Sequence, residues 1–134
     1  MISDEAYQQY VRTALWAETD FDTEAPFDAN YSIADLSPET QAQFKHDLEE
    51  FFTAAEDEIQ ASWGEDIGGS LPFLPHCKRL YVDAAHDFWL TRNRHGAGFW
   101  DGDWAEGEKL TEKAHQFSEC TLYVGDDKLI YNYS

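Results

Sequence analysis

The segment from His86 to Asp101 is dense in side chains that can do chemistry. It reads His-Asp-Phe-Trp-Leu-Thr-Arg-Asn-Arg-His-Gly-Ala-Gly-Phe-Trp-Asp. A histidine here could act as a general base, the neighbouring carboxylate could orient it, and the arginines could bind an anion. A small hydrolase or a metal-dependent enzyme built on this segment would use His86, Asp87, Arg92, Asn93 and His95.

The spacing within this segment argues against that enzyme. Alternate residues of a strand share a face, so in a strand His86 and Asp87 would point to opposite sides of a sheet. The spacing matches no standard pattern of metal ligands, and Gly96-Ala97-Gly98 lacks the lysine and following helix of a phosphate-binding loop. The simpler interpretation is a tight hairpin whose aromatic side chains are core and whose arginines pair with an acidic helix. We therefore predict no catalytic residues, metal or cofactor, and keep the enzyme as the alternative.

The same segment resembles the hallmark motif of a widespread family of small uncharacterised proteins of tailed bacteriophages and prophages. That motif is His-Asp-Phe-Trp-Leu-Thr-Arg-Asn-x-His-Gly-Ala-Gly-Phe-Trp-Asp, and the sequence matches it throughout, with Arg94 at the variable position. The later run Leu122-Tyr123-Val124-Gly125-Asp126-Asp127 adds to the likeness. The resemblance covers the C-terminal third closely and the N-terminal helices loosely, and residues 64–79 look longer than the family's usual connection. It implies a protein made inside an infected or lysogenic bacterium, and it brings no established activity.

Two helices are predicted in the N-terminal half. Ser3 caps the first, which ends near residues 16–18. Residues 19–36 follow as an acidic loop, and Ser37-Pro38-Glu39 opens the second helix. The apolar stripe of this helix consists of Phe44, Leu48, Phe51, Phe52, Ala55 and Ile59. It predicts one rod of about 25 residues, roughly 37 Å long, that ends at Trp63.

The C-terminal half predicts strands around one further helix. Residues 76–85 fit either a short helix or an extended segment. Residues 86–100 predict a β-hairpin that turns at Arg92-Asn93-Arg94-His95-Gly96, residues 106–117 a helix, and residues 121–131 a second hairpin around Gly125-Asp126-Asp127-Lys128. The order of two helices, hairpin, helix and hairpin predicts an α+β fold with a small antiparallel sheet.

Composition indicates one domain spanning residues 1–134. The 43% of hydrophobic and 16% of aromatic residues are sufficient for a core. No apolar run approaches the roughly 20 residues that span a bilayer, and the acidic start predicts that no secretory leader is present. We interpret Cys77 and Cys120 as buried thiols rather than a disulfide, which favours the cytoplasm.

The negative charge of the chain is concentrated in one half. The formal net charge is −18; residues 1–66 hold 17 acids and two bases, whereas residues 67–134 hold 10 acids and seven bases. This division separates an acidic helical half, 1–66, from a hairpin-helix-hairpin half, 67–134. Such a field repels nucleic acid and anionic membranes and attracts a basic groove. A coat that serves only solubility or adaptation to salt has no reason to favour one half.

These observations predict a binding protein that mimics nucleic acid. Carboxylates along a rigid helix can stand in for phosphates and bind a basic nucleic-acid-binding protein or complex of the host, as an anti-CRISPR or anti-restriction inhibitor does. The residues predicted to bind this partner are Asp47, Glu49, Glu50, Glu56, Asp57 and Glu58, with Asp20, Asp22 and Glu24 as a second group. We rank this hypothesis above the enzyme. A third hypothesis is a phage structural or accessory protein that forms a homodimer through its aromatic side chains.

Overall fold

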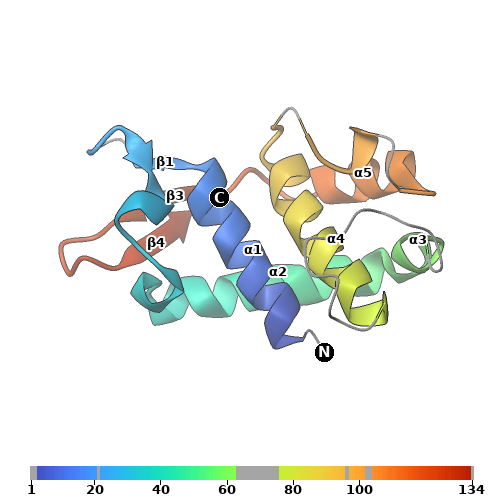
Figure 1. Cartoon of the computed structure of the whole chain (residues 1–134), viewed down its shortest axis with the longest axis horizontal. Helices are drawn as coiled ribbons and strands as arrows, with labels where there is room; N and C mark the ends of the chain where they lie inside the picture. The colour runs from blue at the N-terminus through green and yellow to red at the C-terminus, as the bar shows by residue number, and fades with distance from the viewer. Residues whose placement is uncertain (1–2, 21, 63–75, 96, 102–103, 134) are drawn as a thin grey trace.

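The computed structural model describes residues 3–20, 22–62, 76–95, 97–101 and 104–133 (Figure 1). Its α-helices are α1 (Asp4–Ala17), α2 (Pro38–Ala54), α3 (Glu56–Gln60), α4 (His76–Arg92) and α5 (Gly107–His115). Its strands are β1 (Thr19–Asp20), β2 (Ala25–Pro26), β3 (Thr121–Val124) and β4 (Ile130–Tyr133). Three 3₁₀ turns complete the order, η1 (Phe27–Ala29), η2 (Ile33–Asp35) and η3 (Phe99–Asp101).

The predicted starts of the first two helices are confirmed. The Ser3 hydroxyl accepts a hydrogen bond from the Ala6 amide at 3.2 Å, and the Ser37 hydroxyl accepts one from the Thr40 amide at 3.1 Å. Pro38 occupies the first turn of α2, where its missing N–H costs nothing. Both helices thus begin at side-chain caps that the sequence indicated.

The prediction of one unbroken rod is wrong. Ala55 leaves the helical conformation, with φ −109° and ψ 13°, and separates α2 from α3. The Lys113 ammonium of α5 donates to the Ala54 carbonyl at 2.7 Å. A donor inserted beside the backbone hydrogen bonds is a known cause of a helix bend. The predicted end of the rod at Trp63 lies outside the described residues.

The predicted hairpin over residues 86–100 is also wrong, because residues 86–92 belong to α4. Leu80, Ala84 and Phe88, spaced four apart, are fully buried, and so are Ala85 and Trp89 beside them. Helices α1, α3 and α5 all pack on α4. A helix covered on several sides lacks the polar stripe that identifies a helix in a sequence.

The predicted turn at residues 92–96 is the end of α4 instead. Arg94 has a positive φ of 59°, its amide bonds to the Thr91 carbonyl at 3.1 Å, and the His95 amide bonds to the Leu90 carbonyl at 2.9 Å. This pair of bonds around a left-handed residue is the Schellman motif, which terminates helices. The turn-forming residues therefore reverse the chain after a helix rather than between two strands.

The last two predicted elements are confirmed as a helix, α5, and a hairpin, β3–β4. Strands β3 and β4 pair antiparallel, with Val124 opposite Ile130. They form a two-stranded sheet separate from the short β1–β2 pair. The α+β class is thus confirmed as helices with small antiparallel sheets, whereas a sheet shared by two C-terminal hairpins is not formed.

Aromatic side chains from three helices form the centre of the core. Tyr10 of α1 lies 5.1 Å from Phe44 of α2 and 5.6 Å from Phe88 of α4, measured between ring centroids. Phe51 of α2 stacks on Phe88 at 4.1 Å, with the two rings nearly parallel. In Figure 1, α1 and α4 lie side by side across α2, with the β3–β4 hairpin near the start of α2. Within the described residues, no helix has both the length and the apolar character that crossing a membrane requires.

Candidate functional site

Arg92, one of the arginines that the sequence offers for binding an anion, is instead buried inside the protein. Its side chain is 2% exposed, and its Nη1 atom donates to Asp47 Oδ2 at 2.8 Å and to the Tyr10 hydroxyl at 3.0 Å. Its Nε and Nη2 atoms donate to the Ser118 carbonyl at 3.0 and 2.7 Å. The predicted pairing of an arginine with the acidic helix is therefore confirmed for Arg92.

Asp47 is the buried partner of this ion pair and is absent from the exposed row predicted for α2. Its Oδ1 atom accepts a hydrogen bond from Gln43 Nε2 at 2.8 Å, so both carboxylate oxygens have partners. Burial disfavours the charged guanidinium, but the nearby Tyr10 and Asp47 outweigh it and raise the pKa of Arg92 above its usual value. Burial also raises the pKa of Tyr10, which stays a neutral hydroxyl. The ion pair links α2 to α4 at the centre of the fold.

His86 and Asp87 do lie together, on the outer side of α4. His86 Nδ1 and Asp87 Oδ1 are 2.9 Å apart, and Asp87 Oδ2 accepts a hydrogen bond from Trp104 Nε1 at 2.7 Å. The carboxylate therefore holds the imidazole, and the indole holds the carboxylate. An imidazole oriented in this way can accept or donate a proton at its other nitrogen.

Asn93 and His95 are separated from this pair and have structural partners. His95 Nε2 lies 2.7 Å from Glu18 Oε2, an atom that also accepts from Trp89 Nε1 at 2.9 Å. The Asn93 side chain donates to the Trp89 carbonyl and accepts from the Cys120 amide. Of the five candidate catalytic residues, His86 and Asp87 contact each other, whereas Arg92, Asn93 and His95 each have other partners. Among the described residues, no three metal-ligating side chains gather closely enough to hold a metal ion.

The nine predicted partner-binding acids divide into exposed and internal groups. Asp20 is 5% exposed, and its carboxylate accepts from the Asp22 amide at 3.0 Å, so it shapes a turn. Glu58 accepts from Lys113 Nζ at 2.8 Å, and this hydrogen bond lowers the pKa of Glu58. The prediction that Asp20, Asp47 and Glu58 belong to an open acidic surface is therefore wrong: Asp20 and Asp47 are buried, and Glu58 is paired with Lys113. The acids that remain exposed are Glu49, Glu50, Glu56, Asp57, Asp22 and Glu24.

Four of the exposed acids form a row along α2 and α3, and we call them the acidic row: Glu49, Glu50, Glu56 and Asp57. Helical spacing places Glu49 and Glu50 on the side of α2 opposite its buried aromatic side chains, and Glu56 and Asp57 are exposed on α3 beyond the bend at Ala55. Within the described part of the chain, no lysine or arginine pairs with the row. His46 lies beside it, with Nε2 3.2 Å from Glu50 Oε1. The row is therefore open to a partner from outside.

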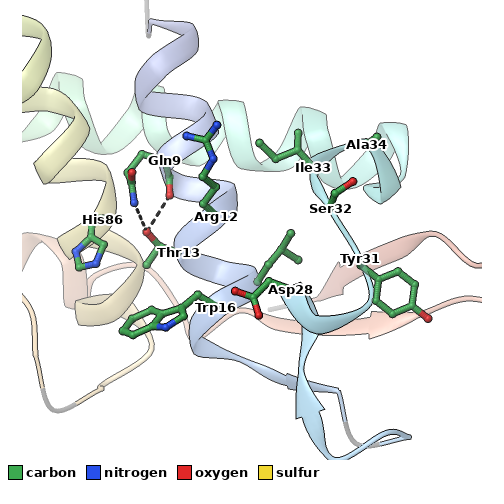
Figure 2. A pocket seen from close by; sticks show the side chains of 11 residues that line it. Gln9, Arg12, Thr13, Trp16, Asp28, Tyr31, Ser32, Ile33, Ala34 and His86 are labelled. Carbon is green, nitrogen blue, oxygen red and sulfur yellow. Dashed lines mark hydrogen bonds between the residues drawn. The ribbon is translucent and has the colours of Figure 1, made fainter. Parts of the chain in front are cut away.

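A groove beside α1 was missed in the sequence (Figure 2). Its volume is about 620 Å³, and its lining includes Arg12, Trp16 and His86. A signal was present, because Gln9, Arg12, Thr13 and Trp16 follow helical spacing and put a large indole on the outer side of a surface helix.

No protein-family model, curated protein or solved structure matches the chain. The resemblance of the His86–Asp101 segment to the phage family stays a prediction from the motif itself. The functional argument therefore depends on the geometry of the acidic row and of the groove.

Proposed function

We propose that the protein binds a basic nucleic-acid-binding protein or complex through its acidic helical half, as a mimic of nucleic acid. The observation that carries this proposal is the acidic row, with four exposed carboxylates that lack a lysine or arginine partner among the described residues. The row belongs to the half of the chain that holds 17 acids and two bases. A channel lined with arginine and lysine would supply the missing counter-charges.

The placement of the row supports mimicry of a phosphate backbone. Glu49 and Glu50 lie on α2, and Glu56 and Asp57 lie on α3 after the bend at Ala55, so the carboxylates follow one another along two successive helices. A strand of a duplex likewise carries a succession of negative charges, one phosphate for about every 3.4 Å of the helix axis. The buried aromatic side of α2 fixes the backbone that carries the row.

The resemblance to phage proteins indicates which class of partner the protein binds. If the protein comes from a phage, as the resemblance implies, its partner is a host defence complex. The protein is then an inhibitor of the anti-CRISPR or anti-restriction type that acts in the host cytoplasm. This protein needs no cofactor and makes no direct contact with nucleic acid. Asp22 and Glu24, exposed beside the turn after β1, extend the acidic surface as a second contact.

The test is affinity capture from bacterial lysate, eluted with either salt or short duplex DNA. We expect capture of a nucleic-acid-binding protein that both agents release, because both compete for its basic channel. A variant with four reversals, E49K, E50K, E56K and D57K, is expected to capture nothing. The matched control reverses four exposed acids of the other half, Glu108, Glu112, Glu119 and Asp126.

The control carries the same change in net charge, so it separates the row from bulk charge. Capture by the row variant, or capture that duplex DNA does not release, would refute mimicry. Loss of capture in both variants would show that total charge, rather than the row, is recognised, which also contradicts the proposal.

One observation favours a second function, the small hydrolase or metal-dependent enzyme. The chain of contacts from His86 through Asp87 to Trp104 orients a half-exposed imidazole on the wall of a groove. Replacing His86 and His95 by alanine and assaying hydrolysis and metal content tests this function. Loss of an activity with partner capture intact would favour the enzyme, and unchanged behaviour would remove it.

A further inference from the structure

The groove beside α1 has two ends that differ in charge. Figure 2 shows the Arg12 guanidinium pointing toward the N-terminal end of α1, away from Trp16, whereas the Asp28 carboxylate lies beside Trp16. The volume of the groove, about 620 Å³, is that of a site for a small molecule. We call the part lined by Trp16, Asp28 and His86 the indole end. It is separate from the acidic row, which belongs to α2 and α3.

The indole end offers an aromatic surface to a ligand. Trp16 is 59% exposed, which is unusual for a side chain of this size. Its ring lies 6.3 Å from the His86 ring at an angle of 28°, a stacked arrangement. The face of an indole carries negative partial charge, and tryptophan is the aromatic side chain that binds cations best. The exposed indole therefore favours a cationic group that lies on it.

A carboxylate without a counter-ion is held beside this indole. Asp28 belongs to η1, whose first residue, Phe27, is buried. The Phe27 amide donates to the Glu18 carbonyl at 3.2 Å, which ties η1 to the end of the helix that carries Trp16. Asp28 itself is exposed, and no basic side chain pairs with it among the residues that the structure describes. The fold thus presents an unpaired negative charge next to the indole.

The remaining charged groups of the groove agree with a cation at this end. Arg12 is directed to the opposite end (Figure 2). His86 Nδ1 lies 2.9 Å from the Asp87 carboxylate, which can only accept, so Nδ1 carries a proton and Nε2 of the neutral ring is an acceptor. Residues 1–66 hold 17 acids and two bases, a field that attracts cations to this surface.

From these contacts we infer that the indole end binds a small guanidinium compound. The guanidinium group is flat, so it can lie on the Trp16 indole while its edge donates two parallel hydrogen bonds to the Asp28 carboxylate. An ammonium group has the same charge but is compact and strongly hydrated, so it gains less from a flat aromatic surface. The ligand is a free small molecule, and the inference does not depend on the acidic row or its partner.

The test compares three probes that share one alkyl chain and differ in the head group: butylguanidinium, butylurea and butylammonium. Butylurea has the shape of butylguanidinium without the charge, and butylammonium has the charge without the flat shape. Each is titrated into the full chain while the indole N–H resonance of Trp16, assigned with W16F, is followed by NMR. We expect butylguanidinium to bind tightest, about fivefold tighter than butylurea, because one ion pair near water contributes that factor.

Two variants separate the carboxylate of the site from the general acidity of the chain. D28N should weaken butylguanidinium about fivefold and leave butylurea unchanged, which also shows that the groove is intact. D22N makes the same substitution at an exposed acid outside the groove and should change neither probe. Equal binding of butylurea and butylguanidinium, tighter binding of butylammonium, or equal weakening by D22N and D28N would overturn the inference.

A last comparison separates a free ligand from a side chain of the partner. Butylguanidinium at a concentration that saturates the groove should leave capture through the acidic row unchanged. Release of the partner by butylguanidinium, but not by butylammonium at the same ionic strength, would assign the groove to an arginine of the partner and overturn a free ligand. The groove titration needs no captured partner, so either proposal can fail alone.

Discussion

The two sides of helix α2 place the same chemical group in opposite situations. Asp47 faces inward and pairs with the buried Arg92 at 2.8 Å, whereas Glu49 and Glu50, two and three residues later, face water. The inward carboxylate is fully hydrogen-bonded and links two helices. The outward carboxylates contribute little to the fold and are free to meet a partner. A count of acids therefore describes a surface only after the buried ones are subtracted.

The largest expected effect comes from breaking the buried side. D47A leaves the Arg92 guanidinium without its counter-ion, and removing one partner of a buried pair costs about 3–5 kcal/mol. We expect urea denaturation to show a free energy of unfolding lower by that amount. The double variant D47A/R92M should lose less than the sum of the single variants, because the pair acts as a unit. A loss below about 1 kcal/mol for D47A would show that the pair is not a link in the core.

A smaller effect is expected at the second buried acid. D20A removes the acceptor of the Asp22 amide and should cost about 1–2 kcal/mol, the range for a lost hydrogen bond at a buried site. D22A, two residues away and exposed, is the matched control and should change stability by less than about 0.5 kcal/mol. Thermal unfolding of both variants measures the contrast. Equal losses would mean that burial does not distinguish the two acids.

Glu58 is intermediate in exposure between the buried and the exposed acids, and its contribution to the stability of the fold depends on pH. The hydrogen bond from Lys113 lowers the pKa of Glu58 below its usual value of 4.5. The pair therefore stabilises the protein fully above that usual value, and the contribution is lost as pH falls through the lower pKa of the folded protein. We expect E58Q to cost less than about 1 kcal/mol at pH 7. The difference from the wild type should vanish in acid, and a difference that grows with acid would contradict the pairing.

The smallest effect on stability is expected from the acidic row itself. Reversing its four charges with E49K, E50K, E56K and D57K should leave the free energy of unfolding within about 1 kcal/mol of the wild type. A slight gain at low salt is expected, because four reversals change the formal net charge from −18 to −10 and weaken the self-repulsion of the chain. Thermal unfolding at 50 and 500 mM salt, about the range over which screening becomes strong, measures this. A large loss would show that the row supports the fold.

The helices with side-chain caps and one apolar stripe could be predicted from the sequence. Ser3 and Ser37 marked the starts of α1 and α2, and the turn Gly125-Asp126-Asp127-Lys128 marked the β3–β4 hairpin. These signals are local, because the residues that make each contact are close in sequence. Helix α4 could not be identified in this way, since neighbours cover it on several sides and its pattern carries no polar stripe.

The candidate site was predictable only in part, for a related reason. Glu49 and Glu50 of α2 and Glu56 and Asp57 of α3 are exposed, as the apolar stripe in the sequence predicted. Whether Asp47 faces water depends on Arg92, which lies 45 positions later and reaches α2 only through the packing of α4. Local spacing cannot show a long-range partner of this kind. For the same reason, local spacing could not show that the five candidate catalytic residues between His86 and His95 have different partners.

One salt titration tests directly whether the exposed carboxylates bind the partner while the buried ones stabilise the fold. The affinity of the captured partner is titrated against salt for the wild type, for E49Q/E50Q/E56Q/D57N, and for a control that neutralises Glu108, Glu112, Glu119 and Asp126. We expect the logarithm of the affinity to fall less steeply with the logarithm of salt in the row variant, because fewer ionic contacts form, and the control to keep the wild-type slope. Equal slopes and affinities for the row variant and the wild type would contradict it.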